Sequence, residues 1–205
     1  MRRFAWLSPV AVAALGVCFL TVVRAGDDDD KDKIAAAKKA EPDVEKLADA
    51  AGKPDELKKQ ADAVVKAHDE MLPIMWQMKP VDKGGMQIGK PGTLDRDSIE
   101  LGLLKLGTKK GAPTAKDLGD QAKAKDLQRM ADVIRGIAEI TPAYAPKYAK
   151  NKQDEKAWND LSEGMKKSSD DLRAAIKAGD DKAFVKATND LNHNCNECHT
   201  KFRDN

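Results

Sequence analysis

The sequence contains few of the residues that build sheets. Aromatic residues make up only 4% of the 205-residue chain, and the hydrophobic share of 41% consists mainly of Ala, Leu, Val and Met. This composition favours helices, because β-branched and aromatic side chains are the ones that pack best on a pleated sheet. A chain of this length forms one domain of ordinary size. We therefore expect an all-α fold without a second, enzymatic domain.

Cysteine and long hydrophobic runs are also scarce. The chain has three cysteines, and the two outside its first 25 residues, Cys195 and Cys198, are only three positions apart. Two such cysteines cannot form the framework of a disulfide-rich domain. The apolar run at residues 7–23 is shorter than the ~20 residues that a transmembrane helix needs. We expect no stable insertion into a membrane.

The first 25 residues have the features of a cleaved secretory signal peptide. Arg2 and Arg3 precede the apolar run, and Arg24 and the small residue Ala25 follow it before a strongly acidic segment. This order of charge, apolar run and small residue is typical of an export signal. We therefore predict a periplasmic protein that has lost residues 1–25.

Two variants of the export signal remain open. Cys18 follows Leu15-Gly16-Val17 in a stretch that resembles a lipoprotein acylation site, although Val17 is larger than the residue usual before an acylated cysteine. The Arg2-Arg3 pair resembles part of a twin-arginine signal, but the flanking residues do not complete that pattern.

The chain also lacks an excess of one charge. Three of its 36 basic side chains, Arg2, Arg3 and Arg24, lie in the expected signal peptide, which leaves 33 against 34 acidic side chains, a net charge of −1. Binding to nucleic acid needs a clustered basic face that neutralises phosphates. We expect no nucleic-acid partner.

Helical periodicity divides the remaining chain into a series of expected helices. In the second of these, apolar and sulfur-containing residues recur at alternating spacings of four and three, the pattern of a helix packed in a bundle. Gly179 stands where a helix C-cap belongs, and Asp180 and Asp181 stand where the next helix begins. The expected helices cover residues 34–51, 57–78, 97–106, 116–140, 152–178 and the segment from Asp181 to the carboxyl end.

The sequence Cys195-Asn196-Glu197-Cys198-His199 has the C-x-x-C-H pattern of covalent haem attachment. Thiols three residues apart lie on one face of a helix, where both can join one haem edge while the next residue ligates the iron. A redox disulfide would need a βαβ setting. A zinc site would need a fourth ligand, for which only His68 and the poorly placed His193 are available. The pattern therefore predicts one covalently bound haem c, with His199 as its proximal ligand.

The end of the chain, from Phe184 to Arg203, resembles the cytochrome c′ family, in which the haem motif lies in the last helix of a four-helix bundle. The resemblance covers residues 54–205, and it implies that Arg203 lies near the proximal histidine and that Phe202 packs against the haem or an adjacent helix. Residues 26–53, an acidic start and an extra N-terminal helix, look like an addition to the family fold, as does the glycine-rich loop at residues 81–95. Relatives often form homodimers through bundle helices.

The sixth iron ligand is a separate question. In the cytochrome c′ family, which this chain resembles, the first bundle helix presents one of two kinds of residue to the iron. An apolar residue leaves the iron five-coordinate, whereas a methionine serves as the sixth ligand. Residues 57–78 offer several donors on one face of the expected helix, although methionine at such positions is most often plain core packing. We favour Met75 as the distal ligand, followed by Met71 and then His68.

The haem motif and the expected compartment together predict one-electron transfer with redox partner proteins, without enzymatic turnover. The alternative is a five-coordinate haem protein that binds or senses small gases such as NO and CO. A thioether ligand would favour the reduced iron and the first function, whereas an open iron would favour the second.

Overall fold

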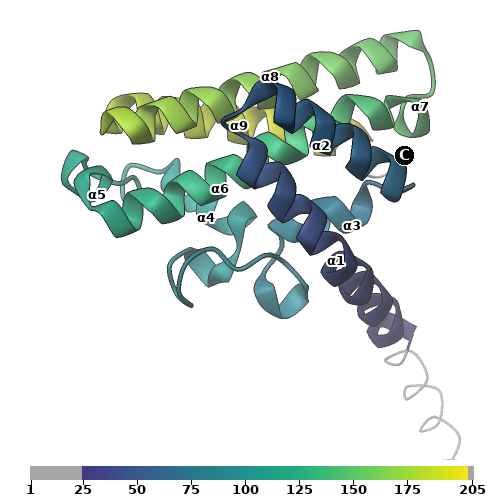
Figure 1. Cartoon of the computed structure of the whole chain (residues 1–205), viewed down its shortest axis with the longest axis horizontal. Coiled ribbons are helices and arrows are strands. Elements are labelled where there is room, and N and C mark those ends of the chain that lie inside the picture. Colours follow the sequence, from purple (N-terminus) through teal and green to yellow (C-terminus); the bar gives the residue numbers. More distant parts are fainter. Residues whose placement is uncertain (1–24, 203–205) are drawn as a thin grey trace, which may run out of the picture.

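The computed structural model describes residues 25–202, and all regular structure in this range is helical (Figure 1). The all-α prediction is therefore confirmed for this part of the chain. None of the helices in residues 25–202 is long and apolar enough to cross a membrane. The predicted signal peptide, with Cys18, lies outside the described residues, as does Arg203. The helices are α1 (Ala25–Ala50), α2 (Pro54–Ala67), α3 (Leu72–Met75), α4 (Ile99–Leu106), α5 (Ala115–Gly119), α6 (Gln121–Ile140), α7 (Ala145–Tyr148), α8 (Lys152–Ala178) and α9 (Asp181–Phe202), with 3-10 turns η1 (Trp76–Met78), η2 (Val81–Lys83), η3 (Asp95–Asp97) and η4 (Thr141–Tyr144).

The core is built on α8, which packs against both α6 and α9 (Figure 1). Its apolar residues Trp158, Met165, Leu172 and Ile176 are spaced by seven, seven and four, so they lie on one face and are buried. The helix has the predicted bounds, and Gly179 ends it with a positive φ of 67° while donating its N–H to the Ala175 carbonyl. The periodicity and the cap together define this helix from sequence alone.

The helix predicted over residues 57–78 is wrong, because the chain leaves the helical conformation at His68. α2 ends at Ala67, His68 has extended backbone angles, and helical structure resumes only at Leu72. Pro73 explains the break, since its ring in a continuous helix would clash with the carbonyl of residue 69 and its nitrogen has no hydrogen to donate. The alternating spacing of apolar residues continues across this break, although the residues belong to two separate helices.

The helix predicted over residues 116–140 is also interrupted. Asp120 has extended backbone angles and its side chain accepts hydrogen bonds from the N–H groups of Ala122 and Lys123, so it caps α6 and separates it from α5. An aspartate at this position serves better as an N-cap than as an interior helix residue.

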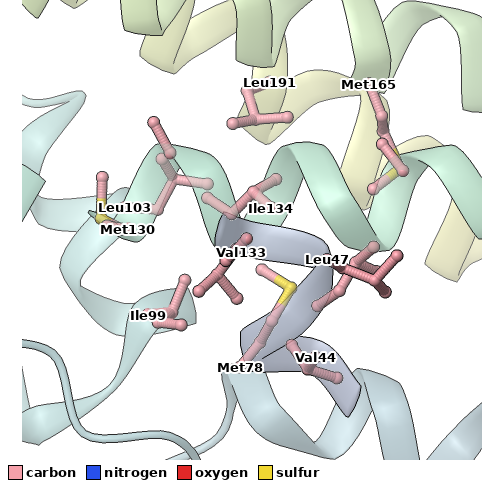
Figure 2. Close-up of a cluster of buried hydrophobic side chains, with 14 of the residues drawn as sticks. Val44, Leu47, Met78, Ile99, Leu103, Met130, Val133, Ile134, Met165 and Leu191 are labelled. Carbon is pink, nitrogen blue, oxygen red and sulfur yellow. The ribbon is translucent and has the colours of Figure 1, made fainter. Parts of the chain in front are cut away.

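The N-terminal helix α1, expected as an addition to the fold, shares the main core. Figure 2 shows Val44 and Leu47 of α1 among side chains from α4, α6, α8 and α9, and both residues are fully buried. α1 packs on α6 at Gly136, where a Cβ atom would lie 2.7 Å from the Cβ of Leu47 and 3.1 Å from its carbonyl carbon. The missing side chain of Gly136 therefore allows the two backbones to approach.

We predict that Gly136→Ala destabilises the fold by about 1–3 kcal/mol, because the new methyl group forces α1 away from α6. Gly119→Ala is the control, since a Cβ there meets nothing within 4 Å, and it should change the unfolding free energy by no more than about 1 kcal/mol in the stabilising direction. Urea unfolding measures both. Equal effects of the two substitutions would contradict the close approach of α1 and α6.

Candidate functional site

A cavity of about 300 Å³ lies between the end of α9 and the segment around α3. α4, α8 and the region of η4 and α7 complete its walls. Most of the lining is apolar, aromatic or sulfur-containing, which is typical of a site for an apolar cofactor. The lining residues are Met71, Leu72, Met75, Trp76, Met78, Lys79, Glu100, Leu103, Leu104, Thr141, Tyr148, Trp158, Met165, Asn192, Cys195, Asn196, Cys198, His199 and Phe202.

One wall of the cavity carries the haem motif. Cys195, Cys198 and His199 all line the cavity, as their spacing of three and one on α9 predicts for neighbours on one helix face. Both cysteines are free thiols, half-buried and packed against the core. The structure thus brings the three predicted site residues together, whereas His193 on the same helix is exposed.

A second part of the cavity lining, the methionine wall, is formed by Met71, Met75 and Met78 from the break after α2. Met71 and Met78 are buried, Met75 is half-buried, and all three line the cavity. His68 does not line it. Its Nε2 lies 2.9 Å from Oδ2 of Asp43 on α1, so the structure brings two of the three predicted distal donors, Met75 and Met71, to the same cavity as His199.

An aromatic cluster closes the cavity where α8 meets the end of α9. The rings of Tyr148 and Trp158 stack in parallel with their centroids 5.0 Å apart. The ring of Phe202 meets that of Trp158 edge-on, with a centroid distance of 5.1 Å and an interplanar angle of 71°. Phe202 is buried, so it packs against the adjacent helix, one of the two roles that the resemblance implies. Trp158 Nε1 donates to the Thr141 carbonyl at 2.7 Å, which leaves its ring fixed.

The rim of the cavity exposes apolar side chains to solvent. Leu72 is 48% exposed and Leu104 is 44% exposed, and both also line the cavity. Exposed apolar side chains gathered at a cavity mark a binding site more often than chance. Lys79 and Glu100 stand at the same cavity and form an ion pair with each other at 2.8 Å.

Burial keeps both thiols protonated. It raises the pKa of Cys195 to about 12, with smaller contributions from Cys198 and Glu100, and it raises the pKa of Cys198 to about 11. Redox-active C-x-x-C pairs show the opposite behaviour, a lowered pKa beside a cation or helix N-terminus. The environment of these thiols therefore does not favour a thioredoxin-like site.

The residues present fit a covalently held haem. Two thiols, an imidazole and methionine side chains line the same cavity, and most of the other lining residues are apolar or aromatic. Thiols for attachment, an imidazole for the iron and an apolar shell are the protein groups that this cofactor requires. The donor set and the lining thus agree on the same cofactor class.

Sequence reasoning missed several lining residues. Leu103, Leu104 and Tyr148 come from short elements that carry no chemical motif, and only the folded chain shows that they face the haem motif. Met165 lies on the buried face of α8, which packs against α9, so the apolar periodicity of this helix was the one signal for it. Trp158 and Trp76 line the cavity as well.

We predict that the thiols of the haem-free, reduced chain react slowly and in a fixed order. At pH 9, iodoacetamide should modify Cys198 faster than Cys195, because burial raises the pKa of Cys195 further and leaves it less thiolate. Both should react much faster in denaturant, where the pKa returns to about 8.5. Fragmentation mass spectrometry locates each adduct, and equal rates in folded and unfolded chain would refute the burial.

No protein-family model, curated protein or solved structure matches the chain. Function must therefore be inferred from the cavity and the groups that line it.

Proposed function

We propose that this protein is an exported monohaem c-type cytochrome that carries single electrons. One haem c is held by thioether bonds to Cys195 and Cys198, with His199 as the proximal iron ligand. The observation that carries the proposal is that these three residues line one apolar cavity together with the methionines Met71 and Met75. Chance occurrence of the five-residue motif does not account for the cavity beside it.

The chain's own residues bind, orient and shield the cofactor. Bound haem supplies a one-electron couple, and the apolar lining excludes water from it, which disfavours the more highly charged oxidised state. Phe202, held against Trp158, forms part of the wall next to the proximal side. The family resemblance implies that Arg203 lies near the proximal histidine.

Met75 is the proposed sixth ligand, with Met71 as the second choice. Both side chains line the same cavity as the haem motif, and a thioether ligand raises the reduction potential. His68 is the weakest of the three candidates, because its Nε2 is already bonded to Asp43. A methionine ligand supports an electron carrier over a gas-binding protein.

The remaining parts of the proposal follow from the family resemblance and the export signal. We place the chain in the cytochrome c′ family, with α2, α6, α8 and α9 as the four bundle helices, and expect a homodimer. Its partners would be redox proteins of the periplasm. We expect no enzymatic turnover, since the oppositely charged side chains at the cavity, Lys79 and Glu100, are bonded to each other.

We predict that the chain, produced in a host that attaches haem outside the cytoplasm, retains a visible haem chromophore after denaturation. Replacing both Cys195 and Cys198 with Ser should abolish this retention, because no thioether bond can form. His199→Ala should alter the spectrum, whereas His193→Ala, an exposed histidine on the same helix, should not. Colourless protein with both thiols free would refute the proposal.

We predict that Met75→Leu removes the far-red absorption band that a methionine ligand gives to ferric haem and lowers the reduction potential. If the thioether occupies the iron about 90% of the time, its removal should raise the apparent CO affinity of the reduced protein by about tenfold. Met165→Leu, which changes a cavity methionine on α8, is the matched control. Immediate stoichiometric CO binding by the wild type would instead support the gas-binding function.

A further inference from the structure

The connection between α2 and α3, residues 68–71, is held by side chains from other parts of the fold. The hydroxyl of Tyr144 in η4 donates to the His68 carbonyl at 2.8 Å. Lys147 of α7 donates to the Asp69 carbonyl, and its Nζ lies 3.7 Å from a carboxylate oxygen of Glu70. The connection has left the helix, so these contacts take over the hydrogen bonding that the helix would have provided.

The His68 side chain is held by α1. Its Nε2 lies 2.9 Å from Oδ2 of Asp43, and the imidazole side chain is only 12% exposed. An ionised carboxylate can only accept hydrogen bonds, so the Nε2 atom carries the hydrogen and donates it. In this arrangement Nε2 has no free lone pair with which to bind iron.

α1 makes a second contact just beyond α3. The Nε2 atom of Gln77, a fully buried side chain, donates to the Ala37 carbonyl at 2.6 Å. Pro42 lies inside α1 and has no N–H. The carbonyl of residue 38, which follows Ala37 in the chain, therefore lacks its usual helical donor. The interrupted bonding of α1 therefore lies next to the carbonyl that receives Gln77.

The two contacts bracket the methionine wall of the cavity. Met71 and Met75 lie between His68 and Gln77 in the chain, and α1 packs along both α3 and η1. α3 has only four residues, too few for a helix that is stable by itself. Its position must come from contacts with the rest of the fold.

We propose that α1 is the positioning element of the methionine wall, with Asp43, acting through His68, and the Ala37 carbonyl, acting through Gln77, as its two anchors. The anchors fix where the sulfurs of Met71 and Met75 stand relative to Cys195, Cys198 and His199. His68 is thus a positioning residue and not an iron ligand. The consequence for iron access rests on the proposed function, whereas the order of the wall does not.

The test compares two aspartates of α1 that both form ion pairs. Asp43→Ala removes the anchor, while Asp49→Ala removes a 2.6 Å ion pair from Asp49 to Arg129 of α6, away from the methionine wall. Asp43→Asn keeps an oxygen that can accept from His68 and should behave like the wild type. Gln77→Met tests the second anchor in case Asp43→Ala does not fold. The Oε1 atom of Gln77 accepts no hydrogen bond in the structure, so its removal leaves no donor without a partner.

Hydrogen exchange of the full chain is the first measurement. The amides of Ile74, Met75 and Lys79, which are hydrogen-bonded within this segment, should exchange about tenfold faster in Asp43→Ala and Gln77→Met than in Asp49→Ala. CO binding to the reduced, haem-loaded protein is the second. Both anchor variants should bind CO faster than the wild type, and Asp49→Ala should not.

The outcomes separate the two proposals. Equal exchange in the Asp43→Ala and Asp49→Ala variants would overturn the positioning role, because α1 would then stabilise the fold only in general. Faster exchange with unchanged CO binding, in a wild type that resists CO, would support the role of α1 in ordering the wall and overturn its consequence for iron access. Failure of the wild type to attach haem, or immediate CO binding by it, would refute the proposed electron carrier, and exchange alone would then decide whether α1 holds the wall.

Discussion

The cavity depends on the packing of α9 against α8. Phe184 and Leu191 of α9 are fully buried, and Asn194 donates to the Ser168 hydroxyl of α8 at 3.2 Å. The absence of a side chain at Gly164 lets Asn194 come this close, since a Cβ there would lie 2.6 Å from its Oδ1. Because α9 is held up to the residue before Cys195, the helix repeat alone places the two thiols and the imidazole on one wall.

The two walls of the cavity are stabilised in different ways. The wall with the haem motif belongs to a 22-residue helix, so its geometry follows from local hydrogen bonds and one apolar face. The methionine wall belongs to a four-residue helix and a 3-10 turn, so its geometry follows from contacts with α1, η4 and α7. A substitution far away in sequence, such as one in α1, can therefore act on the second wall and leave the first unchanged.

This difference also explains what the sequence could predict. The bounds of α8, the cap at Gly179 and the shared face of Cys195 and Cys198 follow from local rules of periodicity and spacing, and the structure agrees with them. The prediction of a continuous helix over residues 57–78 was wrong because it relied on the regular apolar spacing and did not take account of Pro73. The contact of His68 with Asp43 spans 25 positions, and one sequence carries no local signal for such a pair. The cavity lining from α4 and α7 is hidden for the same reason.

The cavity has features that a bound apolar group would relieve. Leu72 and Leu104 face solvent at its rim, and each square ångström of apolar surface covered by a ligand contributes roughly 25 cal/mol. The two thiols lie among apolar groups that raise their pKa, and a thioether bond would replace each with a group that has no charged form. A ligand that fills the cavity stabilises the folded chain in proportion to its affinity. The rim, the thiols and the methionine wall thus all favour one occupant, an apolar group joined through sulfur.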